Sequence, residues 1–132
     1  LHPYSDPLSS ININYYDKGD ALGWHFDNSD FTITLLVKNC EKGGVYEFFN
    51  DMRYENGKEN YDFVEEILDN KVKGTVVNTF EGDLMIFKGN KSLHRVTEVN
   101  KGERILVTFN YNNKKGLPLS EQSRMTFFGR TV

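Results

Sequence analysis

A chain of 132 residues with 38% hydrophobic content is long enough for one domain with a modest core. Its net charge is −3, and its lysines and arginines are scattered rather than gathered in the basic stripe that nucleic-acid binding requires. No apolar run approaches the roughly 18 residues that span a bilayer, so we expect neither a nucleic acid nor a membrane as a partner.

The single cysteine, Cys40, excludes an intrachain disulfide and is typical of a reducing, cytoplasmic location. The chain begins at Leu1 rather than at Met and runs almost directly into a strand pattern. Such a start is typical of a processed or excised piece that lacks an N-terminal segment. We expect one domain over residues 1–132, and the sequence carries no signal for an oligomeric state.

Strand patterns dominate the chain. Eight segments are rich in β-branched and aromatic residues, and clusters of Gly, Asn, Asp or Lys separate most of them. These segments are 11–16, 31–37, 43–49, 74–80, 83–89, 92–99, 104–111 and 124–132. Eight strands at short spacing predict an antiparallel sandwich or barrel. A jelly roll fits best, because it closes over a cavity and protects its edges.

One segment, 59–70, has helical periodicity instead. Its apolar residues Tyr61, Val64 and Leu68 recur at i, i+3 and i+7, with acidic residues on the other side. We therefore expect a mainly β fold with one short helix packed outside the sheets.

GWHFDNSD, residues 23–30, contains two side chains that can bind a metal. Residues i and i+2 of a strand share a face, so His25 and Asp27 point to the same side. Taken alone, such a pair is more often a structural feature of a polar face. Of the other two histidines, His2 lies near a terminus and His94 lies in a strand segment. Two histidines and one carboxylate on one face form the ligand set of non-haem Fe(II) oxygenases.

Two further strand segments turn polar groups to one side. Arg104 begins an apolar strand and shares one face with Thr108 and Asn110. An arginine in such a strand is costly to bury unless it pairs with an anion. Tyr16 shares its strand face with two asparagines. This pattern predicts a cavity for a polar ligand.

These segments give the chain a clear family likeness. YYDKGDALGWHFDNSDF and GDLMIFKGNKSLHRVTEVNKGERILVTFNY resemble the metal-binding and cosubstrate-binding segments of Fe(II)/2-oxoglutarate-dependent oxygenases. This superfamily has the double-stranded β-helix fold, a jelly roll, and includes the prolyl 4-hydroxylases. GGVYEF and the ending SEQSRMTFFGRTV are closer to small stand-alone bacterial oxygenases, some of which halogenate free amino acids. The resemblance covers almost the whole chain.

The resemblance implies an Fe(II) site with three ligands, and a site for 2-oxoglutarate beside it. The implied iron ligands and catalytic residues are His25, Asp27 and His94. The residues implied for the cosubstrate are Arg104, for its distal carboxylate, with Tyr16 and Thr108. O2 is the second cosubstrate. The halogenating relatives have a small residue in place of the carboxylate ligand, so Asp27 favours hydroxylation.

Three residues are candidates for substrate contact. Asn110 shares a face with Arg104, Arg53 lies in a loop that can cover the mouth, and Arg124 lies in the last strand segment. Each also has a structural interpretation. Asn110 can complete the hydrogen bonds at the end of a strand, Arg53 can be a solvated charge in a loop, and Arg124 can form an ion pair on a sheet. Because the 50–58 loop and the 59–70 helix can form a lid, we expect a small-molecule substrate such as a free amino acid.

Two alternatives stay open. A protein or peptidyl hydroxylase of the prolyl type would need an open groove. A non-catalytic jelly-roll binding module, for sugars for example, would not need Arg104 and Tyr16 at these spacings from the histidines. A cupin is disfavoured because its paired HxH ligands are absent.

Overall fold

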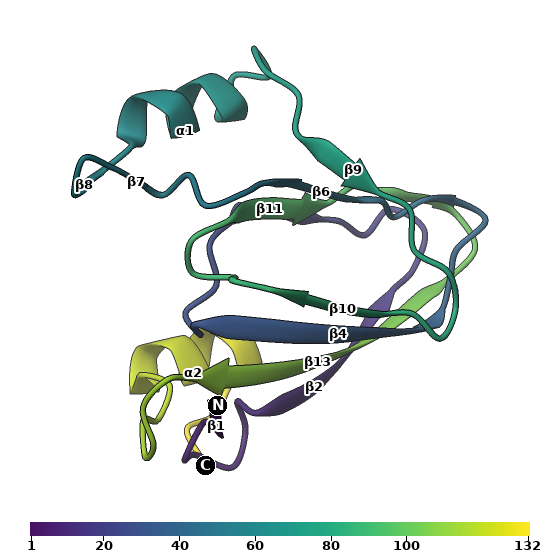
Figure 1. Cartoon of the computed structure of the whole chain (residues 1–132). Coiled ribbons are helices and arrows are strands. Elements are labelled where there is room, and N and C mark those ends of the chain that lie inside the picture. Colours follow the sequence, from purple (N-terminus) through teal and green to yellow (C-terminus); the bar gives the residue numbers. More distant parts are fainter.

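Two antiparallel sheets face each other in the computed structural model, which describes residues 1–132 (Figure 1). The larger sheet contains β1 (His2–Pro3), β2 (Ile11–Tyr16), β13 (Arg104–Asn112), β4 (Phe31–Lys38) and β10 (Leu84–Phe87). The smaller sheet contains, in order, β3 (Leu22–His25), β11 (Leu93–Val96), β6 (Tyr46–Phe49) and β9 (Thr75–Val77). Two short ladders join β5 (Lys42–Gly43) to β12 (Val99–Lys101), and β7 (Tyr54–Glu55) to β8 (Lys58–Glu59). The expected jelly roll is confirmed.

The inner face of the larger sheet is unusually polar. In β4, the side chains that alternate toward the interior are Thr32, Thr34 and Leu36, and all three are buried. Arg104 is also buried, at the start of the neighbouring strand β13. A sheet normally turns its apolar residues to the core, so this inversion makes the space between the sheets suitable for a polar ligand.

Helix α1 (Tyr61–Leu68) covers the outer face of the smaller sheet (Figure 1). Ile67 is almost fully buried there with Leu93 and Met52, and Trp24 packs against the same cluster. The expected external helix is therefore confirmed. It lies on the back of a sheet, however, so the expected role of the helix as a lid over the mouth is wrong.

The C-terminal segment 124–132 is helical, so the strand expected there is wrong. Helix α2 (Glu121–Phe128) begins after Ser120, whose hydroxyl accepts a hydrogen bond from the amide of Ser123 at 3.1 Å. It ends at Gly129, which has a φ of 67° and donates its amide to Met125. These cap signals outweigh the β propensity of the phenylalanines and threonines between them. The fold thus has two helices, each of eight residues, and neither is long and apolar enough to cross a membrane.

The other expected strands are present: β2 has the expected bounds, β4 and β13 each extend one residue further, and the rest are shorter. The 92–99 segment divides into β11 and the start of β12, and the 43–49 segment contributes mainly β6. Strand β3 ends at His25, so Asp27 lies just beyond the strand end. A side chain at this position can turn toward an ion more freely than one inside a strand, where the pairing with the neighbouring strand fixes its direction.

Candidate metal and cosubstrate site

Three side chains converge where β3 and β11 pair. His25 and His94 are directly opposite each other in the ladder, and their ring centroids lie 4.2 Å apart. The Nε2 atom of each lies 3.2 Å from Oδ1 of Asp27. One ligand atom from each residue lies within 4.8 Å of the other two. The structure thus brings together the three residues that the sequence predicts as ligands, and their donor set of two nitrogens and one carboxylate fits Fe(II).

The orientation of both imidazoles is fixed by backbone carbonyls. Nδ1 of His25 lies 2.7 Å from the carbonyl oxygen of Gly23, and Nδ1 of His94 lies 2.7 Å from that of Ser92. With its proton on Nδ1, each ring donates to the carbonyl and leaves the Nε2 lone pair for a metal. Both histidines are therefore arranged as metal ligands without further rotation.

Asp27 is held tightly from two sides. The Thr32 hydroxyl donates to Oδ2 at 2.5 Å, and the amide of Asp27 donates to the carbonyl of Gly89 at 2.9 Å. A Cβ atom at Gly89 would lie 2.1 Å from Oδ2, so only glycine fits there. Burial acts to raise the pKa of Asp27, but its contacts with the two imidazoles and the hydrogen bond from Thr32 hold it well below its usual value. The carboxylate is therefore charged and ready to bind a cation.

Arg104 provides a buried positive charge at the start of β13, in the larger sheet. It is only 3% exposed, and its guanidinium carbon lies 5.4 Å from the ring centroid of Tyr16, its partner in the β2–β13 ladder. Its Nε and Nη1 atoms have no hydrogen-bond partner. Burial lowers the pKa of Arg104. A buried guanidinium with unused donors requires an anion, and the distal carboxylate of 2-oxoglutarate fits this requirement.

Tyr46 is a second buried residue with an unpaired polar atom, and it lies beside His94 although the sequence did not single it out. Its hydroxyl is buried without a partner, and its ring centroid lies 5.7 Å from that of His94. Burial, together with the charge of Asp27, raises the pKa of Tyr46, so the hydroxyl is a neutral donor. The alternation of Tyr46 and Phe48 in GGVYEF could have indicated an inward-facing tyrosine, because residues i and i+2 share a face.

Two other predicted residues of the larger sheet are already engaged within the protein. The hydroxyl of Thr108 accepts from the amide of Asn14 at 3.4 Å. Asn110 donates to the carbonyl of Ser9 at 2.9 Å and accepts from the Ser29 hydroxyl at 3.4 Å. These contacts agree with the structural interpretation of Asn110, in which its side chain completes the hydrogen bonds at the end of a strand.

The two candidate arginines also have partners in the chain. Arg53 donates to the carboxylate of Glu59 at 3.3 Å and to the carbonyl of Asn90 at 3.0 Å, and it lies over the ring of Phe26. Arg124 lies on α2, not on a strand, and donates from Nη1 to the carbonyl of Thr131 at 2.7 Å. In this structure both guanidiniums therefore bind protein groups, which supports a structural role for each.

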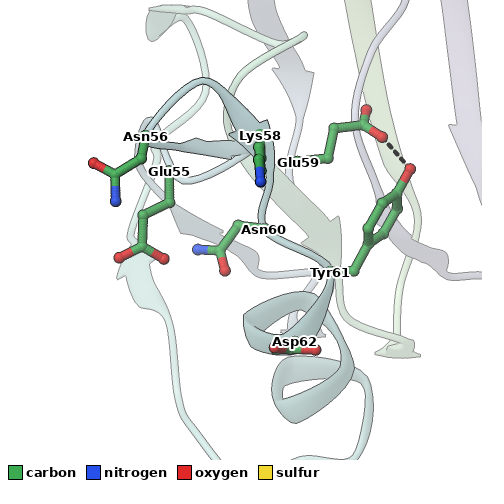
Figure 2. Close-up of a pocket in the computed structure, with 7 residues that line it drawn as sticks. All are labelled: Glu55, Asn56, Lys58, Glu59, Asn60, Tyr61 and Asp62. Carbon is green, nitrogen blue, oxygen red and sulfur yellow. Dashed lines mark hydrogen bonds between the residues drawn. The ribbon is translucent and has the colours of Figure 1, made fainter.

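A shallow hollow lies on the surface where β7 and β8 meet the start of α1 (Figure 2). Its lining is polar apart from one aromatic residue, and the Tyr61 hydroxyl donates to Glu59 within it. The lining residues are Glu55, Asn56, Lys58, Glu59, Asn60, Tyr61 and Asp62. None of them belongs to the metal cluster, so this hollow is a solvated surface feature.

The fold, the metal cluster and the buried arginine together define a member of the 2-oxoglutarate/Fe(II) oxygenase superfamily. Residues 2–126 match the family model described as halogenase D, so the chain belongs to that family. No protein among the curated sequences matches the chain.

The solved structures that share the fold include the following two. One is an oxidoreductase of the 2OG-Fe(II) oxygenase family from Burkholderia pseudomallei, with a TM-score of 0.58 and 18% identity over 81% of this chain and 43% of that chain. The other is a Pseudomonas putida prolyl-4-hydroxylase, with a TM-score of 0.50 and 18% identity over 77% of this chain and 52% of that chain. The chain thus spans about half the length of these two structures.

Proposed function

We propose that this chain forms the catalytic core of an Fe(II)- and 2-oxoglutarate-dependent hydroxylase that acts on an unactivated C–H bond of a small molecule. The observation that carries the proposal is the position of Asp27. Its Oδ1 atom lies 3.2 Å from Nε2 of both His25 and His94, so a carboxylate completes the ligand set. With 2-oxoglutarate and O2, iron in such a site supplies the oxidising power for C–H bonds.

The protein groups around the iron would bind and orient the cosubstrate. Arg104 would pair with the carboxylate of 2-oxoglutarate that lies farther from the metal, because its Nε and Nη1 atoms have no other partner. The Tyr46 hydroxyl also lacks a partner and would donate to the same molecule. Tyr16 would form a wall beside Arg104, and Thr108 would offer a further hydroxyl. These buried groups also exclude water from the reaction.

Hydroxylation, rather than halogenation, follows from the same carboxylate. A halide ligand needs a coordination position that a small residue leaves open, and Asp27 fills this position. The hydrogen bond from Thr32 and the close approach of Gly89 prevent Asp27 from moving aside. We therefore assign oxygen transfer to this chain, although its family is described as a halogenase family.

Product analysis tests this assignment. The protein is incubated with Fe(II), 2-oxoglutarate, O2 and chloride, together with either a pool of free amino acids or proline-containing peptides. We expect succinate release that depends on the amino acids, and a product that carries one added oxygen atom. A product with the isotope pattern of chlorine would contradict hydroxylation. Turnover of the peptides alone would instead support the prolyl-type alternative.

A further inference from the structure

Strand β3 and the residues just after it supply two of the three metal ligands, but the backbone pairing of this strand is short. It has four residues and lies at the edge of the smaller sheet, with β11 as its one neighbour. Only two positions pair in this ladder, and the register shifts between them. Asp27 lies beyond the strand end and has no ladder partner. Side-chain contacts must therefore help to keep the ligands in place.

The aromatic residues on either side of His25 turn away from the metal. Trp24 and Phe26 alternate with His25 and Asp27, and both pack against the apolar cluster that helix α1 covers. The Nε1 atom of Trp24 is buried without a partner, so no hydrogen bond fixes this ring. Its position depends on the groups that pack against its faces and edges.

An arginine lies over each of these two rings. The guanidinium carbon of Arg95 is 4.7 Å from the ring centroid of Trp24. That of Arg53 is 4.9 Å from the ring centroid of Phe26. Both distances are within the roughly 6 Å at which a cation is attracted to the face of an aromatic ring. Each ring beside a metal ligand is thus held by a charged group as well as by apolar neighbours.

Arg95 is anchored to the next strand of the sheet. Its ladder partner on β6 is Glu47, and one carboxylate oxygen of this residue lies 2.8 Å from Nε and 2.7 Å from Nη2 of Arg95. The other oxygen accepts a hydrogen bond from the amide of Gly74 at 2.9 Å. Glu47 is buried, so this charged contact is shielded from solvent on one side. Through Trp24, Arg95 therefore connects three strands, β3, β11 and β6.

Arg53 is anchored to the loop that packs against Asp27. Its Nη1 atom donates to the carbonyl of Asn90 at 3.0 Å, and its Nε atom donates to Glu59 on β8 at 3.3 Å. Asn90 follows Gly89, whose carbonyl accepts the amide of Asp27 at 2.9 Å. Arg53 thus connects the β7–β8 hairpin to the loop that holds the metal carboxylate.

From these contacts we propose that Arg95 and Arg53 are positioning residues for the metal site. Each holds one aromatic residue of the segment 24–27 from behind. Together they keep His25 and Asp27 at the distances from His94 that a single ion requires. This inference rests on the proposed function, and it adds two residues that act on the ligands through the rings between them.

Lysine variants separate this role from a contribution to folding. Lysine keeps the positive charge for Glu47 or Glu59, but it lacks the planar guanidinium that lies flat on a ring and donates from several nitrogens at once. Arg95→Lys and Arg53→Lys therefore leave no carboxylate without a cation. We expect the apo forms of both variants to unfold in urea at midpoints close to that of the wild type.

The first measurement is Fe(II) affinity, by anaerobic competition with a chromogenic chelator. We expect Arg95→Lys and Arg53→Lys each to lower the affinity about 10-fold, and the double variant about 100-fold, as is typical when the support of a metal ligand is lost. The matched control is Arg130→Lys, the same change at an exposed arginine outside the metal cluster. It should bind Fe(II) as the wild type does.

A double-mutant cycle tests whether Arg53 acts through Phe26. Phe26→Leu removes the ring but keeps an apolar side chain, and we expect it to lower Fe(II) affinity as well. Because both changes break the same contact, adding Arg53→Lys to Phe26→Leu should cause little further loss. A further 10-fold loss in the double variant would contradict an action through the ring.

The absorption of bound Co(II) gives a readout that a merely structural role would not change. Its visible bands depend on the number and arrangement of the ligands around the ion. With Co(II) in saturating excess, we expect the band maxima or absorption coefficients of Arg95→Lys and Arg53→Lys to differ from those of the wild type. Arg130→Lys should reproduce the wild-type spectrum.

The outcomes separate this inference from the proposed function. Wild-type Fe(II) affinity and wild-type Co(II) bands in both lysine variants would overturn the inference, while Fe(II) and 2-oxoglutarate binding by the wild type would still support the function. Loss of urea stability with unchanged Co(II) bands would assign the two arginines to folding alone and would overturn it too. A folded wild-type protein that binds neither Fe(II) nor Co(II) would reject the function, and the inference with it.

Discussion

His25 and His94 face each other across the antiparallel strands β3 and β11, with their ring centroids 4.2 Å apart. The ladder between these strands therefore sets the spacing of the two nitrogen donors. The backbone carbonyls of Gly23 and Ser92 set the rotation of the two rings. Because these constraints belong to the fold, the metal site is formed by the protein before an ion binds.

Replacement of Arg104 by Met should separate cosubstrate binding from stability. The guanidinium is buried with two nitrogens unpaired, so removing it should leave the apo protein at least as stable in urea unfolding. The affinity for 2-oxoglutarate should fall at least about 100-fold, because a buried charge pair is lost. Anaerobic titration of the Fe(II)-loaded protein measures this affinity.

The control for this variant is Arg130→Met, which removes an exposed guanidinium that forms no salt bridge. We expect it to bind 2-oxoglutarate as the wild type does. An Arg104→Met protein that keeps its affinity would show that the cosubstrate binds elsewhere.

Tyr46→Phe should act in the same direction with a smaller effect. Its hydroxyl is buried without a partner, so the variant should be as stable as the wild type or more stable. If the hydroxyl donates to a 2-oxoglutarate carboxylate, its loss weakens binding by roughly 10- to 100-fold, since a hydrogen bond to a charged group contributes about 1.5–3 kcal/mol. Tyr61→Phe removes an exposed hydroxyl on α1 and is the matched control. Equal affinity in the two variants would remove Tyr46 from the cosubstrate site.

Gly89→Ala should damage the metal site without touching a ligand. The new Cβ atom would lie 2.1 Å from Oδ2 and 2.7 Å from Cβ of Asp27, so the carboxylate must move. Displacement of a ligand by its surroundings typically lowers metal affinity about 10- to 100-fold. Competition with a chromogenic chelator measures Fe(II) affinity. Gly23→Ala, where a Cβ meets no atom within 4 Å, should retain wild-type affinity.

Asp6 should contribute stability that depends on pH. Its buried carboxylate accepts hydrogen bonds from the amides of Leu8, Ser9 and Leu119, and so ties the N-terminal loop to the segment before α2. Burial acts to raise the pKa of Asp6, but these hydrogen bonds outweigh it and lower the pKa below its usual value. Asp6→Asn should therefore reduce the free energy of unfolding at pH 7 by about 2 kcal/mol.

The sign of the pH effect follows from the lowered pKa. The folded protein holds the Asp6 carboxylate in its charged form more strongly than the unfolded chain does, so the stabilisation is complete well above the ordinary pKa of about 3.8. It decreases as the pH falls through the folded pKa. Urea unfolding of the wild type and Asp6→Asn at pH 7 and pH 3 should show the difference between them shrinking at pH 3. A constant difference would exclude this role for the carboxylate.

The parts of the site that depend on local spacing could be predicted from the sequence. His25 and Asp27 lie two residues apart, and this spacing predicts that both turn to one side, although Asp27 lies just beyond the strand end. Arg104 could be predicted because an arginine is out of place in an apolar strand. The family resemblance implies His94 as the third ligand, but only the register between β3 and β11 shows that it is opposite His25.

Features that depend on long-range packing could not be predicted in the same way. Tyr46 resembles any other strand tyrosine until the ladder with β11 directs it toward His94. Arg53 lies in a loop, and its pairing with Glu59 depends on the β7–β8 hairpin. The helix at Glu121–Phe128 replaces the expected strand for a different reason, because its caps at Ser120 and Gly129 outweigh its β-prone residues.

The central claim is that this chain binds Fe(II) and 2-oxoglutarate together at the cluster of His25, Asp27 and His94. Visible absorption under anaerobic conditions tests it most directly. When 2-oxoglutarate is added to the Fe(II)-loaded protein, we expect a weak charge-transfer band that saturates at one equivalent of iron. His94→Ala should lack the band at the same concentrations. A folded wild-type protein that shows no band with both ligands in excess would contradict the claim.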